Sequence, residues 1–527
     1  MPVRAACRRL VAARRDRGVV AILAALLMTT FLGFCAFAVD FGHWYLVGEQ
    51  TQKAADAAAL AAVVNLPDDF DNAQTTAARY AALNGFPVAS GTSVTTSRVM
   101  GDPGRLSVTV STTVGNFFTG LFGVPTSTIS STGDASYVGS VKMGSPCNRL
   151  GSDPDATADT EAAACQGLAT GRYWLNVSGP DTDKSSGDPY QTLVCTQSVS
   201  DHCPGGTNTD YTPDGYGYNV TVKVGGPVQI EIFDPAWVNV GDLCDKNLAT
   251  AKNAVNPYVT DASTRYAAGN LAGNKWCTGD STAKTGVISD TFSLLGTTGG
   301  DDIASHDPVP LCTRTWTGYD GDLFKALNAA SPGYRPEVAE SFRRWVPLCT
   351  VTGAGTYVLK VTAPLGSSMN RFAVRAVGRG MATTTVSGRE KLDLYTSDDN
   401  PATQFFLARV PSTGAGQTLV VRFFDIGDAK SAGKITIKPP SGSVGCKQYD
   451  VTDRLLGNLD PCVITTSSAY NGKWRTLRIP VPTTYRCQDF DNTACWYTVS
   501  FDYQGSAPTD TSAWTAKMDG QAVRLVR

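Results

Sequence analysis

Residues that most often carry out catalysis are scarce in this chain of 527 residues. It has three histidines, so a Ser-His-Asp or Cys-His site would need His43, His202 or His306. His43 lies beside two aromatic residues next to a long apolar run, where an aromatic belt is expected at a membrane surface. His202 and His306 are isolated in sequence. The sequence therefore predicts a protein that is not an enzyme, with no catalytic residue assigned.

Short catalytic motifs point the same way. The sequence contains no G-x-S-x-G elbow, no H-E-x-x-H helix and no Gly-rich phosphate loop. Residues 281–284 match S-x-x-K and residues 284–286 match K-T-G, but in penicillin-recognising enzymes these motifs lie on separate elements. Here they share Lys284, which indicates a chance match. A secreted hydrolase is kept only as the third alternative.

Four acidic clusters could supply oxygen ligands to calcium, and they lie at residues 181–183, 398–400, 425–428 and 489–492. None has the spacing of an EF-hand loop. Asp and Asn also favour turns through their own hydrogen bonds to the backbone. We therefore assign no metal site and no cofactor.

Aromatic residues near the end of the chain could stack sugars. Trp474, Trp496 and Trp514 are the candidates for such a platform. Large aromatic side chains more often supply buried area in a core. Core packing is the favoured interpretation, and a surface glycan or protein ligand remains an alternative partner.

Cysteine usage indicates disulfides. Twelve of the 14 cysteines lie beyond residue 146, and none forms a CxxC pair. An even number in an exported protein is expected to pair. Eight precede about residue 383 and four follow it, so we expect no bridge between the two sets. We predict a bridge from Cys487 to Cys495, because a turn-rich segment joins them, and leave the other pairings open.

The apolar run from Gly18 to Val39 carries no charge. At 1.5 Å per residue it is about 33 Å long, enough to cross a bilayer core of about 30 Å. Six arginines and one acid precede it in residues 1–17, so the positive-inside rule places the N-terminus in the cytoplasm and the rest outside. The remainder is mildly acidic, which excludes the basic footprint of a nucleic-acid-binding domain.

Cleavage of this run is the rival interpretation. Residues 36–38 form an A-x-A site, after which a signal peptidase could cut. The run is longer than the apolar region of an ordinary signal peptide, which favours an uncleaved anchor. Both interpretations stay open, and the expectation is a single-pass protein of the cell membrane.

Residues 40–65 predict a helix that continues out of the bilayer, since alanine dominates residues 54–62. Ala54, Ala58 and Ala62 form a stripe of small side chains that permits close approach of another helix. The stripe can pack on its own domain or on neighbours in a filament. A second helix is predicted at residues 73–83, capped by Asp69 or Asp71, and a β-hairpin at 92–114.

The N-terminal quarter resembles the TadG-like N-terminal region of Tad (Flp) pilus-assembly proteins. The matching elements are Gly18-Val-Val-Ala-Ile, Ala38-Val-Asp40, the alanine-rich segment 52–61, the segment 78–85, and Phe117-Phe-x-x-Leu-Phe-Gly123. Together they cover about residues 14–140. The resemblance implies a membrane-anchored, minor-pilin-like component and other Tad pilus proteins as partners. The DxSxS metal motif that some such proteins carry in a von Willebrand A domain does not occur here.

Residues 140–527 are rich in Gly, Thr, Ser, Asp and Pro, with many short alternating segments that favour β-sandwiches. The predicted fold class is α+β and mostly β. The predicted organisation is a basic tail at 1–17, a transmembrane helix at 18–39, a pilin-like module at 40–139, and disulfide-bonded β-sandwiches at 140–382 and 383–527. The expected function is structural, in Tad pilus assembly or secretion, and the alternative is a surface adhesion module.

Overall fold

The computed structural model describes residues 6–526, apart from gaps at 66–69, 90, 100–101, 138–140, 167, 169–172, 243–274, 283–285, 297–309, 390, 397–402, 427–432, 489–490, 503–509 and 520–522. The chain forms two compact units, unit 1 at residues 1–137 and 523–527, and unit 2 at residues 138–522.

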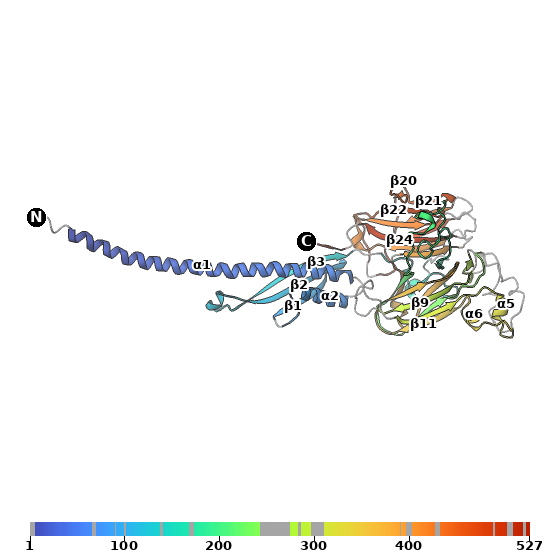
Figure 1. Ribbon diagram of the computed structural model, residues 1–527, viewed down its shortest axis with the longest axis horizontal. Coiled ribbons are helices and arrows are strands. Elements are labelled where there is room, and N and C mark those ends of the chain that lie inside the picture. The colour runs from blue at the N-terminus through green and yellow to red at the C-terminus, as the bar shows by residue number, and fades with distance from the viewer. Residues whose placement is uncertain are drawn as a thin grey trace. The chain divides into compact units, whose positions relative to one another are not determined.

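Unit 1 is one long helix packed on a small antiparallel sheet (Figure 1). Helix α1 (Ala6–Ala62) ends in a short 3₁₀ turn, η1 (Val63–Asn65), and helix α2 (Phe70–Leu83) follows. The sheet has the order β1-β2-β3-β25. Its strands and the turn between the second and third are β1 (Thr92–Val99), β2 (Asp102–Gly115), η2 (Thr119–Phe122), β3 (Thr126–Tyr137) and β25 (Val523–Leu525).

The local predictions for unit 1 agree with these elements where the structure describes them. The continuous helix, the second helix and the hairpin are present. Asp71 is not the N-cap of α2, because the helix already begins at Phe70, and Asp69 lies outside the described residues.

Unit 2 is built from three antiparallel sheets and a few short helices. The largest has twelve strands: β4 (Arg149–Leu150), β5 (Trp174–Ser178), β7 (Val228–Phe233), β8 (Ser281–Thr282), β11 (Trp345–Val351), β13 (Ser368–Gly378), β15 (Lys391–Thr396), β17 (Thr418–Phe424), β19 (Cys446–Tyr449), β20 (Leu455–Leu459), β22 (Trp474–Pro480) and β24 (Asp510–Asp519).

The other two sheets are smaller. The five-stranded sheet holds β6 (Tyr216–Val222), β9 (Ser289–Leu295), β10 (Pro310–Thr317), β12 (Gly355–Thr362) and β14 (Thr384–Gly388). The four-stranded sheet holds β16 (Thr403–Arg409), β18 (Lys434–Lys438), β21 (Val463–Thr465) and β23 (Trp496–Asp502). The short α-helices are α5 (Leu323–Leu327) and α6 (Pro336–Ser341). The short 3₁₀ turns are η3 (Ala163–Cys165), η4 (Lys184–Ser186), η5 (Pro204–Gly206), η7 (Met381–Thr383), η8 (Ser412–Gly414) and η9 (Ser468–Tyr470).

Each smaller sheet packs on part of the twelve-stranded sheet. Phe372 of β13 contacts Tyr218 and Phe292 of the five-stranded sheet, at ring-centroid distances of 6.1 and 5.2 Å. Trp514 of β24 contacts Phe405 of the four-stranded sheet at 5.3 Å. One continuous hydrophobic core contains Phe372, Phe292, Trp514 and Phe405. Unit 2 is therefore two sandwiches that share one large sheet.

The predicted boundary at residues 382/383 falls inside this compact unit. Strand β15, just after the boundary, pairs with β5 from the first predicted domain and with β24 from the second. Gly144 also forms a β-bridge with Phe406 across it. The sequence pattern predicts strands, but it does not indicate which strands pair when they are far apart in the chain. For this reason the sequence predicts two separate sandwiches instead of one shared sheet.

Residues 523–527, predicted as part of the C-terminal domain, belong to unit 1 instead. Strand β25 pairs with β3, with Val523 opposite Tyr137. Unit 2 is thus inserted between two neighbouring strands of unit 1. A three-residue strand at the end of a chain carries too little alternation to reveal this.

Five disulfides join described cysteines: Cys147–Cys165, Cys195–Cys203, Cys312–Cys349, Cys446–Cys462 and Cys487–Cys495. The last is the bridge predicted from the sequence, and none of these five joins the two predicted sets. Cys277 is also disulfide-bonded, and Cys244 lies outside the described residues. The mostly β fold class with a long apolar N-terminal helix is confirmed.

Candidate functional site

Helix α1 changes character along its length. In the described part of the chain, one helix, at Val19–Asn65, is long and apolar enough to cross a membrane. Its first half leaves large apolar side chains exposed, such as Leu27 at 69%, Phe31 at 68% and Phe34 at 70%. From Val47 onward, buried side chains recur on one face. The helix therefore combines an apolar segment whose large side chains are exposed and a segment that belongs to a folded core.

The alanine stripe lies in the second half. Ala54, Ala58 and Ala62 are fully buried. Ala58 and Ala62 belong to a core cluster with three alanines of α2 and three apolar residues of β2, namely Ala73, Ala77, Ala81, Leu106, Val108 and Val110. Of the two interpretations left open by the sequence, the structure shows the stripe packed on its own domain.

Strand β3 uses the small side chains to approach the helix backbone. A Cβ atom added at Gly133 would lie 2.7 Å from the carbonyl group of Ala55 and from the backbone nitrogen of Asp56. Thr51 hydrogen-bonds Ser131 at 3.0 Å, and Gln52 Nε2 donates to the carbonyl of Thr132 at 3.0 Å. The close approach that the stripe permits is thus taken by a strand rather than by a second helix.

Asp40, directly after the apolar run, holds the turn between β2 and β3. Its fully buried carboxylate accepts backbone N–H groups of Phe117 at 2.8 Å, Phe118 at 3.0 Å and Thr119 at 2.6 Å. Trp44 Nε1 donates to Asn116 Oδ1 of the same turn at 2.8 Å. These hydrogen bonds therefore attach the β2–β3 hairpin to α1 at the residues that directly follow the apolar run.

In the sequence, Asp40 and residues 117–123 stand out only as parts of a resemblance. A usable signal was present, because residues 106–133 carry no charged side chain at all. His43, predicted to be interfacial, lies on the same side, with its ring 5.2 Å from that of Phe117.

The structure describes one of the two remaining histidines. His202 Nδ1 lies 2.9 Å from Asp210 Oδ1, and His306 lies outside the described residues. Ser281 of the S-x-x-K match is buried, and Lys284 lies outside the described residues.

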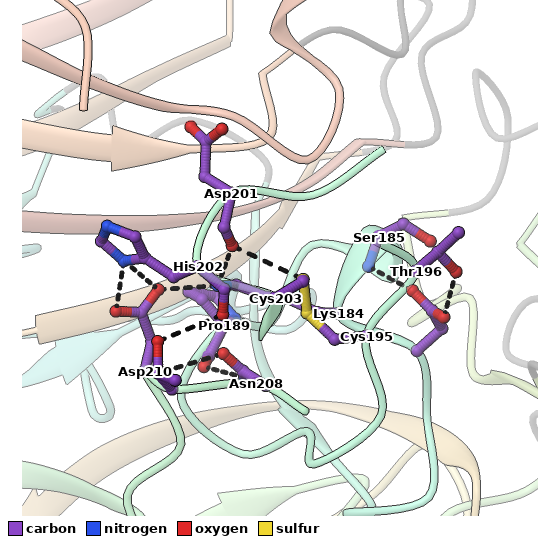
Figure 2. Close-up of a disulfide and its surroundings, with 12 residues drawn as sticks. Lys184, Ser185, Pro189, Cys195, Thr196, Asp201, His202, Cys203, Asn208 and Asp210 are labelled. Atoms are coloured by element: carbon purple, nitrogen blue, oxygen red, sulfur yellow. Dashed lines mark hydrogen bonds and ion pairs between the residues drawn. A yellow bond between two sulfur atoms is a disulfide. The ribbon is translucent and has the colours of Figure 1, made fainter. Parts of the chain in front are cut away.

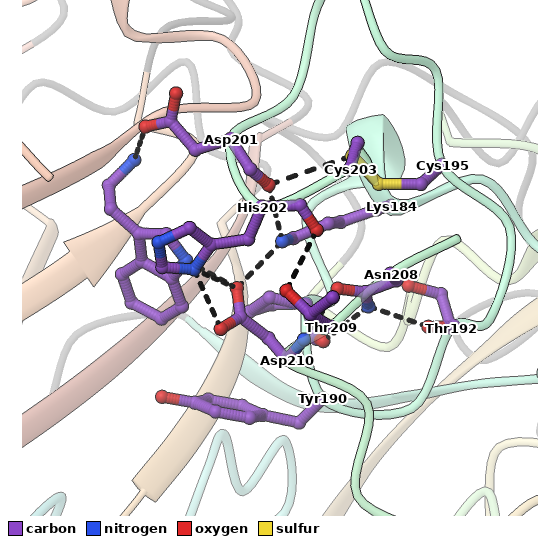
Figure 3. Close-up of polar contacts among 12 residues, drawn as sticks. Lys184, Tyr190, Thr192, Cys195, Asp201, His202, Cys203, Asn208, Thr209 and Asp210 are labelled. Atoms are coloured by element: carbon purple, nitrogen blue, oxygen red, sulfur yellow. Dashed lines mark hydrogen bonds and ion pairs between the residues drawn. A yellow bond between two sulfur atoms is a disulfide. The ribbon is translucent and has the colours of Figure 1, made fainter. Parts of the chain in front are cut away.

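Asp210 is the centre of a polar clamp in unit 2 (Figure 3). Lys184 Nζ donates to Asp210 Oδ2 at 2.7 Å and to the carbonyl of Asp201 at 2.7 Å. Trp474 Nε1 also donates to Asp210 Oδ2, at 2.7 Å. Burial alone would raise the pKa of the Asp210 carboxyl, but the hydrogen bond and charge of Lys184 outweigh it and lower that pKa.

The Cys195–Cys203 disulfide closes the same loop (Figure 2). Asp201 Oδ2 accepts the backbone N–H of Trp474, so the loop is tied to the start of β22 at two points. These contacts are those of a structural clamp between a loop and a sheet.

The acidic clusters serve turns and caps where the structure describes them. Asp183 accepts the N–H of Ser185 at 2.9 Å, and Asp491 accepts that of Thr493 at 2.8 Å. Asp425 accepts the N–H of Gly472 at 2.6 Å. Asp398, Asp399, Asn400, Asp428 and Asp489 lie outside the described residues. Among the residues that the structure describes, no group of three or more candidate metal ligands occurs.

The three candidate tryptophans are core residues. Trp474, Trp496 and Trp514 are 1%, 4% and 0% exposed. The favoured interpretation of core packing is therefore confirmed. The alternative, that these three side chains form a sugar-stacking platform, is wrong because a ligand cannot reach their faces.

Comparisons with known proteins bear on the helix of unit 1. No curated protein matches the chain. A family model described as Flp pilus-assembly TadE/G-like matches residues 18–65. The apolar helix and the disulfides suggest membrane anchoring with extracytoplasmic domains. Residues 18–65 therefore carry a Tad, TadE/G-like segment, and the resemblance drawn from the sequence is confirmed for that segment.

Proposed function

We propose that the chain is a minor-pilin-like component of a Tad/Flp pilus assembly or secretion system, anchored in the cell membrane by residues 18–39. The observation that carries the proposal is the family match over residues 18–65. The matched segment contains both the exposed apolar part of α1 and the part that packs on the sheet. It therefore includes the junction between an anchor and an exported domain.

The direction of insertion follows from charge. Six arginines precede the apolar run, and the described disulfides all lie beyond residue 146. Disulfides persist outside the reducing cytoplasm. Both features support a cytoplasmic N-terminus and two extracytoplasmic units.

Contacts with other pilus proteins are assigned to the exposed half of α1. Because the alanine stripe is buried in its own unit, it offers no free surface to a partner helix. Many large apolar side chains between Val19 and Leu46 are exposed, so this half of α1 has a free surface, and helices in a bilayer associate by van der Waals packing.

We also propose that the role is structural rather than catalytic. His202 is engaged with Asp210 in a clamp that fastens a loop to Trp474, which supports a use in stability.

Two measurements test the proposal. Intact-mass analysis of the membrane fraction should give the full chain, and a mature chain beginning at Val39 would overturn the anchor. Affinity purification from detergent-solubilised membranes should recover Tad pilus-assembly proteins. The control replaces residues 18–39 by an unrelated transmembrane helix and should keep the membrane location but lose these partners. Recovery of no pilus-assembly protein by the unaltered chain would contradict the assignment to pilus assembly.

A further inference from the structure

The turn between β2 and β3 exposes an unusual amount of apolar surface. We define the apolar loop as residues 116–125, which include η2. Leu121 is 82% exposed and Phe122 is 80% exposed, with Phe117 at 62% and Val124 at 50%. Side chains of this size are normally buried, and contiguous exposed apolar patches mark a surface that meets a partner or a membrane.

Hydrogen bonds to α1 hold the backbone of the apolar loop in place. The Asp40 carboxylate accepts three successive backbone N–H groups of the loop, from Phe117, Phe118 and Thr119. Asn116 braces the base, since its Nδ2 donates to the carbonyl of Val124 at 2.8 Å while its Oδ1 accepts from Trp44. The exposed side chains are therefore presented by a fixed scaffold.

The level at which the loop is attached to α1 decides what it faces. Its contacts are with Asp40, His43 and Trp44, which directly follow the uncharged run that ends at Val39. Five helical residues advance about 7.5 Å. The polar layer on each side of a bilayer core is about 5–8 Å thick. The attachment point therefore lies at the depth of the lipid headgroups when residues 18–39 span the core.

The surroundings of the loop suit this depth. No charged residue occurs between Arg105 and Asp134. The part of the β2–β3 hairpin near its turn therefore places no charged side chain in the headgroup layer. The hairpin runs along α1 with its tip toward the N-terminal half of the helix (Figure 1). On α1 itself, Phe41 and Tyr45 are 59% and 66% exposed at the same level. Aromatic residues are enriched at this interface.

We propose that the apolar loop is a second membrane contact, inserting Leu121 and Phe122 into the outer boundary of the bilayer beside the anchor helix. Its ligand is lipid, at the level where headgroups meet acyl chains. With two points of contact, unit 1 would hold a fixed rotation about α1 instead of turning freely. The inference rests on the proposed spanning of the bilayer by residues 18–39.

The experiment measures immersion depth in the full chain, reconstituted in phosphatidylcholine vesicles. Cys7 and Cys35 are replaced by serine, and one spin label is placed at Leu121→Cys or Phe122→Cys. Phe31→Cys, 68% exposed in the apolar run, reports the bilayer, and Val64→Cys, 45% exposed in η1 just after α1, reports water. Each label is scored by its collisions with oxygen, which concentrates in lipid, and with a water-soluble nickel chelate.

Labels at 121 and 122 should follow Phe31, with an oxygen-to-nickel accessibility ratio severalfold above that of Val64. A water-like ratio at 121 and 122 together with a lipid-like ratio at Phe31 would overturn the inference and leave the anchor intact. Protection of 121 and 122 from both reagents would assign the loop to a second copy of the chain and also overturn it. A water-like ratio at Phe31 itself would contradict the anchor.

Discussion

Asp40 shows how one side chain can join two distant parts of a fold. Asp40 directly follows the apolar run. Its carboxylate accepts hydrogen bonds from the backbone N–H groups of residues that lie 77 to 79 positions further along the chain. Hydrogen bonds to a charged acceptor are stronger than those between neutral groups. The position therefore contributes to the orientation of the β2–β3 turn relative to α1.

Replacing Asp40 by asparagine should loosen this turn. An amide keeps one acceptor oxygen and turns an NH₂ group toward the remaining donors, so at least one charged hydrogen bond is lost. Hydrogen exchange at the amides of residues 117–119 should quicken about tenfold or more. Asp56→Asn is the control, since Asp56 accepts a side-chain donor, Gln52, on the same helix. Equal exchange in both variants would show that Asp40 does not hold the turn.

Asp290 lies on the buried face of β9, where Phe292 and Leu294 fill the core. Burial raises the pKa of its carboxyl well above the usual 3.8, although Asn370 donates to it at 2.9 Å. The folded protein therefore binds a proton that the unfolded chain releases above about pH 4. This contribution to stability is present below pH 4 and is lost as the pH rises through the folded pKa.

Asp290→Asn should remove that pH dependence. Relative to the wild type, the variant should gain stability as the pH rises from about 4 to 7, by at most about 1.4 kcal/mol per pH unit. Tryptophan fluorescence in denaturant is a suitable measurement, because of the nine tryptophans only Trp44 precedes unit 2. Asp322→Asn is the control, since the hydrogen bond from the Lys325 backbone N–H lowers the pKa of Asp322. The stability contribution of a lowered pKa is lost only as the pH falls below about 4, so the difference between this variant and the wild type should stay constant from about pH 4 to 7. A constant difference between wild type and Asp290→Asn across this range would refute the raised pKa.

Helix α1 and strand β3 approach each other closely in unit 1. Alanines on the helix and Gly133 on the strand remove the side chains that would otherwise separate the two backbones. Helix α2 completes the core with its own alanines. Packing of α2 therefore reports whether this contact is intact.

Gly133→Ala should disrupt it. The new methyl group would lie 2.7 Å from backbone atoms of Ala55 and Asp56, which cannot rotate away, and overpacking of this kind costs about 1–3 kcal/mol. Gly115→Ala is a matched control, because Gly115 also lies on a strand and a methyl group added there would have no other atom within 4 Å. Exchange of the α2 amides should quicken in the first variant only. Unaltered exchange at α2 in Gly133→Ala would mean that the strand can shift without loss.

Ala58→Leu tests the same core from the helix side. Leucine is nearly as good a helix former as alanine, so only packing distinguishes a buried site from a partly exposed one. We expect Ala58→Leu to lower the free energy of unfolding of unit 1 by about 1–3 kcal/mol, which would be seen as faster hydrogen exchange at the amides of α2. Ala57→Leu is the control and should have little effect, because Ala57 is partly exposed. If Ala58→Leu left α2 protected but abolished co-purification with pilus proteins, the stripe would be an interface after all.

In the order of the chain, unit 2 is an insertion between β3 and β25, which are neighbouring strands of unit 1. Within it, one disulfide joins the edges of two different sheets, since Cys312 lies on β10 and Cys349 on β11. The Cys487–Cys495 bridge closes a single short loop. The two bridges should therefore contribute differently to stability.

Removing Cys312–Cys349 by serine substitution at both positions should cost more than removing Cys487–Cys495. The sequence separations are 37 and 8 residues, for which loop-closure entropy predicts losses of about 4 and about 2.5 kcal/mol. Denaturant unfolding followed by tryptophan fluorescence reports both variants. The reverse order would show that the contribution of these bridges is set by local contacts rather than by chain entropy.

Features that depend on neighbouring residues can be predicted from the sequence alone. The apolar run, the alanine-rich helix, the β-hairpin, the short-range Cys487–Cys495 bridge and the mostly β composition are all encoded within stretches of a few to some twenty residues. Periodicity, helix propensity and turn chemistry act over that range. For this reason the family segment was also recognisable from residues 18–65.

Which surfaces meet depends on contacts between segments that are far apart in the chain. Whether Ala58 faces a neighbouring molecule or the core of its own unit depends on strands far along the chain, and the same sequence pattern fits both. Pairing of β5 with β15, return of β25 to β3 and burial of Asp290 in an apolar core are likewise set by contacts between distant segments. Local propensity carries no record of such partners, because strand pairing and core packing are selected by the free energy of the assembled fold.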